Sequence, residues 1–259
     1  MFPLRDDNPH FLTPYVTYGL IAVNVFVWLV VQGVGFEPGL MRSVCSLGLI
    51  PGDLTGVFPA GTKLPMGSAG FCVVDPDGAW TGLFTYMFVH GSWLHIIMNM
   101  WFLWIFGNNV EDSMGHVRFA MFYLLCGLLA AALQVASEPG LGAPIVGASG
   151  AIGGVMGAYI LLYPRVNVHF LFFFGFFFSI IAIPAFWMLA YWLIFQLLGA
   201  TTSVGANSGI AFWAHVGGFI AGAALVTLFR KPELVARHPY HGWKAQVEAP
   251  PSWRKVSPD

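Results

Sequence analysis

The chain has 259 residues, of which 57% are apolar and only 9% carry a charge. A water-soluble protein of this length could not bury that much apolar surface, so the soluble globular class is excluded. The 31 glycines and 24 phenylalanines suit helices that pack closely in lipid, and the net charge of -1 indicates no particular partner.

Six segments reach or approach the roughly 17–25 residues that a membrane-spanning helix needs. Backbone in lipid must satisfy its own hydrogen bonds, so each segment is predicted to be a helix. The predicted spans are residues 12–33, 93–111, 117–136, 149–164, 184–200 and 209–229. Residues 1–11 before them are too poor in basic side chains for a signal peptide, and we expect them to be retained.

The long segment over residues 35–80 is expected to fold against the outer membrane surface. Facing an oxidising compartment, its Cys45 and Cys72 are a candidate disulfide. Two free thiols fit the sequence equally well, because spacing does not fix the distance between them. Cys126 lies in an apolar run and is predicted to be a core residue.

The apolar run over residues 166–200 is too long for one span, since a single helix would extend about 50 Å at about 1.5 Å per residue. Proline favours the first turn of a helix and disfavours helical geometry in the residue before it. The fifth span is therefore predicted to start at Pro184, with residues 169–183 interfacial or partly re-entrant on the cytosolic side. A seventh helix here is the alternative.

The basic residues favour six spans with both termini in the cytosol, because cytosolic loops hold the excess of Lys and Arg. Those assigned to the cytosol are Arg5, Arg118, Arg165, Arg230, Lys231, Arg237, Lys244, Arg254 and Lys255, and those outside are Arg42 and Lys63. A seventh helix would carry the basic tail across the membrane.

The predicted organisation is a cytosolic segment (residues 1–11), a membrane domain (12–230) and a cytosolic, disordered tail (231–259). We expect a multi-pass protein of a bacterial inner (cell) membrane.

Polar side chains are rare inside the predicted spans, and such residues are functional candidates by default. They are His95, Asn99, Ser149 and His215. In the six-span topology each lies in the first turns of a helix that runs from outside to inside, so the four should meet in one leaflet.

Ser149 opens a glycine-rich helix, where free backbone N–H groups can stabilise an oxyanion. Alone it could be a helix cap. His215 supplies a general base, with no acidic residue near it in any span, so a dyad is predicted. Gly153 and Gly157 of one helix and Gly218 and Gly222 of the other have the spacing of close helix contacts.

His95 and Asn99 lie four positions apart on one helical face, and with the Ser149 amide they could form an oxyanion hole. A polar pair that joins helices is the alternative. His90 is expected to order the loop or hold water, and His10, His116, His169, His238 and His241 are expected to lack convergent partners. His90, His95 and His215 could in principle bind zinc, but there is no H-E-x-x-H motif, and no metal is expected.

Together these motifs resemble the rhomboid family of intramembrane serine proteases over roughly residues 10–230. The motifs read GASG at 147–150, AHVGG at 214–218, and His90-GSWL-His95-IIM-Asn99 followed by GNNVE at 107–111.

The resemblance implies an all-α, six-transmembrane-helix bundle that cuts without a cofactor and admits substrate helices sideways past the fifth span. It implies that Ser149 is the nucleophile, His215 its base, and His95, Asn99 and the Ser149 amide the oxyanion site. The partners implied are transmembrane protein substrates and the lipid bilayer, and no nucleic acid.

Two positions depart from the family's pattern. The residue four after the nucleophile is often aromatic and stacked on the histidine, but here it is Gly153, which leaves open what orients His215. A Trp-Arg pair of the first outer loop is absent. The alternative functions are a non-catalytic rhomboid-like protein that binds membrane clients and, without a visible internal repeat, a small-molecule transporter.

Overall fold

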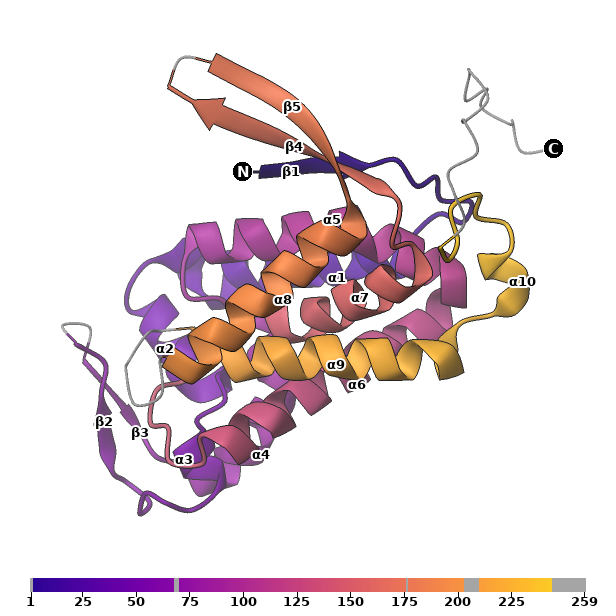
Figure 1. Cartoon of the computed structure of the whole chain (residues 1–259). Helices are drawn as coiled ribbons and strands as arrows, with labels where there is room; N and C mark the ends of the chain where they lie inside the picture. Colours follow the sequence, from indigo (N-terminus) through magenta and orange to yellow (C-terminus); the bar gives the residue numbers. More distant parts are fainter. Residues whose placement is uncertain (1, 68–69, 176, 203–209, 244–259) are drawn as a thin grey trace.

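The computed structural model describes residues 2–67, 70–175, 177–202 and 210–243 and shows a helical bundle with a β-sheet beside it (Figure 1). The long helices begin and end within a few residues of the predicted spans. They are α1 (Tyr15–Phe26, continued by a π-helical turn, Val27–Val31), α5 (Trp93–Met114), α6 (His116–Ser137), α7 (Ser149–Leu162), α8 (Ala185–Thr202) and α9 (Phe212–Phe229).

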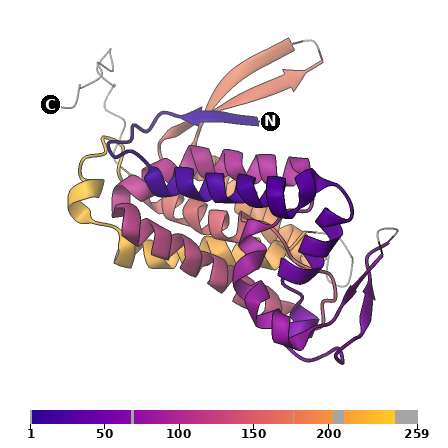
Figure 2. The same ribbon diagram turned by 180° about the vertical axis from the view of Figure 1, so that it is seen from behind.

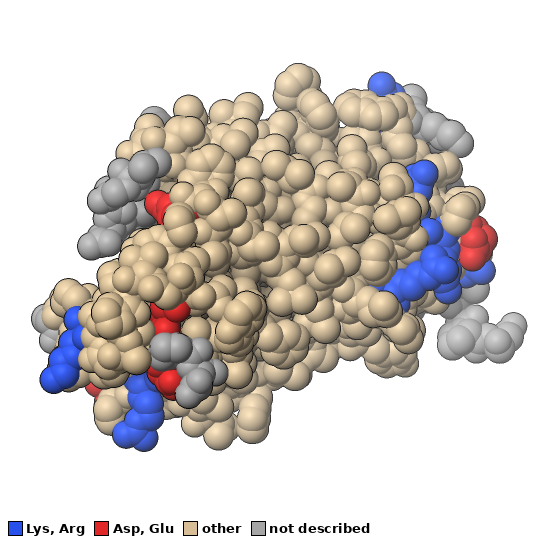
Figure 3. Space-filling model, turned by 90° about the horizontal axis from the view of Figure 1, so that it is seen from below, with Lys and Arg blue, Asp and Glu red and all other residues tan. Residues whose placement is uncertain are grey.

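The described surface is that of a membrane protein. By length and composition α6, α8 and α9 could each cross a bilayer, and Tyr15–Val31 and α7 are shorter apolar helices. On the face shown in Figure 3, charged side chains gather at two opposite ends of the molecule, and the broad band between them carries none. Large apolar side chains such as Val30, Ile194 and Leu228 are exposed, as expected for contact with lipid.

Helix α7 lies in the centre and contacts α5, α6, α8 and α9 (Figure 1). A Cβ added to Gly218 would collide with the Gly150 carbonyl oxygen, and one on Gly222 would collide with that of Gly154. The predicted close approach of the helices that carry Ser149 and His215, α7 and α9, is confirmed. The contact also fixes how far α7 and α9 are shifted along each other, and so the relative positions of their first turns.

The N-terminal end of α5 carries candidate site residues, and its C-terminal end holds α1 through buried carboxylates. Glu111 accepts hydrogen bonds from the Thr17 amide (2.8 Å) and hydroxyl (2.7 Å), and Asp112 accepts from the Phe11 and Leu12 amides (2.6 and 2.9 Å). The bond to Glu111 satisfies the Thr17 amide in the first turn of α1, and the bonds to Asp112 hold the residues just before the helix. Helix α1 therefore lies along α5 (Figure 2).

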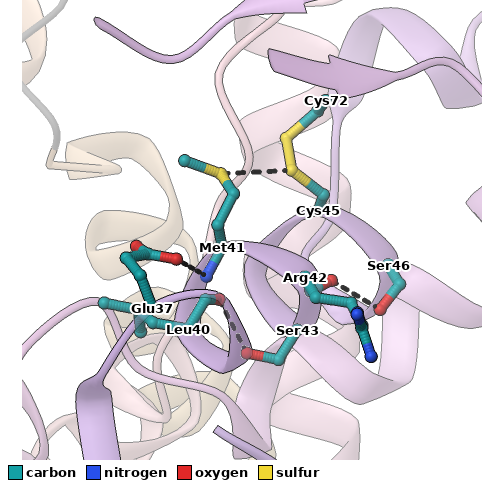
Figure 4. Close-up of a disulfide and its surroundings, with 8 residues drawn as sticks. All are labelled: Glu37, Leu40, Met41, Arg42, Ser43, Cys45, Ser46 and Cys72. Carbon is teal, nitrogen blue, oxygen red and sulfur yellow. Dashed lines mark hydrogen bonds between the residues drawn. A yellow bond between two sulfur atoms is a disulfide. The ribbon is translucent and has the colours of Figure 1, made fainter. Parts of the chain in front are cut away.

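The described residues of the segment over 35–80 have secondary structure of their own. The chain here forms α2 (Gly39–Leu47), the short α3 (Pro51–Leu54), the hairpin of β2 (Lys63–Pro65) and β3 (Phe71–Val73), and α4 (Pro76–Thr85). Cys45 of α2 and Cys72 of β3 form a disulfide, with Met41 Sδ 3.5 Å from Cys45 Sγ (Figure 4). Of the two possibilities left open by the sequence, the structure has the disulfide.

The described residues between 166 and 184 contain no helix, so the structure does not support a seventh helix there. Strands β4 (Asn167–Phe174) and β5 (Phe177–Pro184) form a hairpin whose tip projects beyond the helices (Figures 1 and 2). β1 (Phe2–Asp6) pairs antiparallel with β4 and completes a three-stranded sheet. The all-α class is therefore corrected: aromatic and β-branched residues here favour strands.

Part of the segment expected to be a disordered tail is ordered. Residues 232–243 include α10 (Pro232–Val235) and pack on the bundle, with Val235, His238 and Tyr240 buried. Burial of these side chains explains the order. The rest of the predicted tail, residues 244–259, lies outside the described residues.

The expectation that the remaining histidines lack partners is wrong for four of them, since His241 Nδ1 lies 3.0 Å from the His238 carbonyl oxygen and three others face carboxylates. His116 Nδ1 lies 2.6 Å from Glu111, His169 Nε2 lies 2.8 Å from Asp7, and His238 Nε2 lies 3.2 Å from Asp112. Each histidine–carboxylate pair joins segments that are distant in sequence or meet at a helix junction, so the sequence alone did not reveal them.

Candidate active site

Ser149 is the first residue of α7, and the chain before it is held in place by backbone pairing. Leu49 and Ile145 exchange hydrogen bonds of 2.9 and 2.7 Å, and the Gly147 amide donates to the Tyr86 carbonyl at 2.9 Å. Gly147 has φ +117°, and a Cβ there would lie 2.6 Å from His95 Nε2. Glycine is therefore needed both for the turn and for the space beside His95.

His215 lies in the first turn of α9, and its Nε2 is 2.7 Å from Ser149 Oγ. Both side chains are half-buried. The predicted meeting of a hydroxyl and an imidazole from two helices is confirmed as geometry. The Ser149 hydroxyl can donate to Nε2 when that nitrogen carries no proton.

His95 and Asn99 lie in the first two turns of α5 and face the same space as Ser149. The Gly91 amide donates to His95 Nδ1 at 3.4 Å, an arrangement that leaves Nε2 as the protonated, donating nitrogen. Asn99 Nδ2 donates to the His95 carbonyl at 3.0 Å, and its second N–H is available for another acceptor.

These four residues line a single cavity of about 570 Å³. Met98, Phe102 and Trp192 form part of its apolar wall. A second cavity of about 460 Å³ also touches His95 and is bordered by Leu64 and Met66 of the segment over residues 35–80. A small extended peptide could occupy space of this size next to the Ser149 hydroxyl.

His90 lies beside the site and is fully buried. Its ring packs edge-on against that of His95 with 5.2 Å between centroids, and its backbone exchanges hydrogen bonds of 2.8 and 2.7 Å with the Gln32 side chain. These contacts agree with the ordering role expected for His90. Within the described residues, no three His, Cys, Asp or Glu side chains gather so that they could hold a metal ion.

Two residues of α8 contact His215 and were not identified from the sequence. Gln196 Oε1 lies 2.8 Å from His215 Nδ1, and the Trp192 ring lies 5.7 Å from the imidazole, tilted by 40°. A Cβ on Gly153 would lie 3.7 Å from Trp192 Cη2, so the indole occupies the space beside that glycine. An aromatic neighbour of His215 is therefore present, but it comes from α8.

A serine–histidine pair in the first turns of two tightly packed helices, α7 and α9, in a bundle with an uncharged surface band, defines a membrane protein with a hydrolase-like site. The Rhomboid domain model matches residues 77–232, and the chain belongs to the rhomboid family of membrane proteins. The family contains serine proteases and also inactive members.

Three relatives, two of them with protease names, share 26–31% identical residues with parts of this chain. The chain is 28% identical over 70% of its length to Rhomboid-type serine protease 2 of Emericella nidulans, covering 35% of that protein. It is 31% identical over 33% of its length to the Putative rhomboid protease YdcA of Bacillus subtilis, covering 43% of it. RHOMBOID-like protein 4 of Arabidopsis thaliana is 26% identical over 69% of this chain and 39% of its own length.

In each of these matches the chain spans less than half of the relative's length. The relatives include plant proteins named as mitochondrial and chloroplastic, besides bacterial and fungal ones. They support an integral, multi-pass membrane protein, but they do not support the bacterial inner membrane expected from the sequence.

Proposed function

We propose that this chain is a serine endopeptidase that hydrolyses peptide bonds in or near transmembrane helices of membrane-protein substrates. The observation that carries the proposal is the 2.7 Å distance between Ser149 Oγ and His215 Nε2 in a shared cavity. The protease names of several relatives are consistent with it. The proposed protease domain covers residues 12–230, with six spans and both termini in the cytosol.

In the proposed first step, Ser149 Oγ attacks the scissile carbonyl carbon while its proton passes to His215 Nε2. The carbonyl oxygen becomes an oxyanion, which in this proposal is stabilised by hydrogen bonds from the Ser149 amide, His95 Nε2–H and the second N–H of Asn99. The proton on His215 then goes to the leaving amine as the C–N bond breaks, which leaves an acyl-enzyme.

In the second step, water attacks the acyl carbon and gives a proton to His215, which returns it to Ser149 Oγ when the ester bond breaks. The new carboxylic acid then leaves. Substrates whose helices unwind easily near the cut are favoured, because an α-helical backbone does not present its carbonyls to a nucleophile.

The test compares wild type, Ser149→Ala and His215→Ala purified in detergent and in liposomes, with a single-span substrate and a fluorophosphonate probe. We expect cleavage and labelling by wild type and at least about a thousandfold loss of cleavage in both variants. Ser46→Ala, which removes an exposed hydroxyl bonded only to the Arg42 carbonyl, is the matched control and should cleave normally.

Equal cleavage by wild type and both variants would contradict the proposed dyad. Binding of the substrate without cleavage or labelling by wild type would instead indicate a non-catalytic protein that binds membrane clients.

A further inference from the structure

His215 has its second ring nitrogen occupied by a side chain of another helix. Gln196 is buried and lies in an otherwise apolar stretch of α8, and its Oε1 is 2.8 Å from Nδ1. A carbonyl oxygen can only accept a hydrogen bond, so the proton must lie on Nδ1. A neutral imidazole with its proton on Nδ1 has a free lone pair on Nε2, the nitrogen that faces Ser149.

We propose that Gln196 is a positioning residue that holds His215 in the tautomer and orientation needed for a base, in place of the carboxylate of a catalytic triad. The inference rests on the proposed function and deepens it. His215 is then oriented by side chains of α8, although Gly153 stands where the family often has an aromatic residue. The support for His215 comes from two residues one helical turn apart on α8, Gln196 at Nδ1 and Trp192 at the ring face.

No carboxylate among the described residues hydrogen-bonds to His215. The other histidine that lines the same cavity is His95. The carboxylate of Glu138 accepts a hydrogen bond from Gln134 Nε2 at 2.6 Å, and Gln134 Oε1 accepts one from the Ala214 amide at 3.1 Å. Gln196 is therefore the described side chain that can accept a hydrogen bond from His215 Nδ1–H and stabilise the imidazolium formed during catalysis.

The surroundings of Gln196 argue against a purely structural role. Most residues of α8 are exposed or half-buried, and its buried residues are Ala185, Leu189, Gln196 and Ala200. Three of these four are small or aliphatic side chains suited to helix packing. The amide of Gln196 is costly to bury without a partner, and among the described residues the side chain that contacts its Oε1 is the His215 ring.

The test uses Gln196→Leu, which keeps the approximate size and loses the acceptor, and Gln196→Glu, which restores an acceptor with a charge. We expect Gln196→Leu to lower kcat about tenfold to hundredfold with little change in KM or Tm. In Gln196→Glu we expect activity to be recovered towards high pH. The acid limb of its pH–kcat/KM profile should move to higher pH, because a carboxylate favours the protonated imidazole.

The matched control is Gln134→Leu, since Gln134 is also a buried glutamine whose Oε1 accepts from α9, but from backbone rather than from the ring. We expect it to lower Tm and to leave the acid limb in place. The proposal would be overturned if both Gln196 variants had the kcat of wild type and the acid limb of their pH–kcat/KM profiles lay at the same pH as in wild type. A loss in Gln196→Leu that Gln196→Glu does not restore at any pH would also overturn it. Should Gln196→Leu fail to fold, the shift of the limb between wild type and Gln196→Glu decides.

A readout without activity separates this proposal from the proposed function. In 15N-histidine-labelled protein, with His215 assigned by its loss in His215→Ala, wild type should show the Nδ1–H tautomer, and Gln196→Leu should show a mixture. The same tautomer populations in both would overturn the role of Gln196. If wild type neither labels nor cleaves, the proposed function fails, and the tautomer measurement still decides about Gln196.

Discussion

The carboxyl group of Asp6 lies where the N-terminal strand meets α5 and α7. Its Oδ2 accepts hydrogen bonds from the Tyr159 hydroxyl at 2.5 Å and the Asn109 amide at 2.8 Å. Burial raises the pKa of Asp6 from 3.8 to about 7. Between these two pH values the folded chain retains a proton that the unfolded chain has released, so the contribution of Asp6 to stability falls as pH rises towards 7.

Asp6→Asn keeps the shape of the side chain and removes this titration. We expect the fall in Tm between about pH 5.5 and about pH 8 to be smaller in Asp6→Asn than in wild type, measured by thermal unfolding in detergent. Glu233→Gln, which removes an exposed carboxylate, should follow wild type. Identical pH dependence in Asp6→Asn and wild type would rule out this account of Asp6.

At the scale of single residues, the sequence predicted four members of the site because polar side chains are rare in spans. Gln196 satisfies the same rule, as an amide in an apolar run, but no motif singled it out. Trp192 could not be identified in this way, since aromatic side chains are ordinary on lipid-facing helices. Its contact with His215 depends on how α8 is rotated, which is a property of packing.

At the scale of elements, the contact between α7 and α9 sets the separation of the two catalytic candidates. Gly222→Ala would place a Cβ against the Gly154 carbonyl oxygen, and overpacking of this kind typically costs about 1–3 kcal/mol. We expect a lower Tm and a parallel loss of substrate cleavage. Ala224→Leu, on an exposed position of the same helix, should change neither.

The helices could be predicted because long apolar runs end at glycine, proline and serine. The strands could not, because an apolar run by itself does not distinguish a buried helix from a strand. Pro184 predicts that residues 169–183 lie outside the spans, but the third strand of their sheet, β1, lies more than a hundred residues away along the chain.

At the scale of the whole molecule, the six-span topology makes a prediction for reporter fusions. Alkaline phosphatase, which is active only outside the cytosol, should be active when fused after Gly140 and inactive after Arg165 or Asp259 in a bacterial host. Green fluorescent protein at the same positions should give the reverse pattern. Phosphatase activity at Asp259 would show an odd number of spans and contradict the proposed topology.

The position of Gln196 and Trp192 on α8 has a consequence for the order of events during turnover. If a substrate enters by pushing this helix aside, the movement withdraws both supports from the imidazole at the moment of entry. With α8 in the open position His215 would then not act as a base, and cleavage would begin only after α8 had closed over the bound substrate. In such an enzyme, substrate entry and peptide cleavage would take place in two different positions of α8.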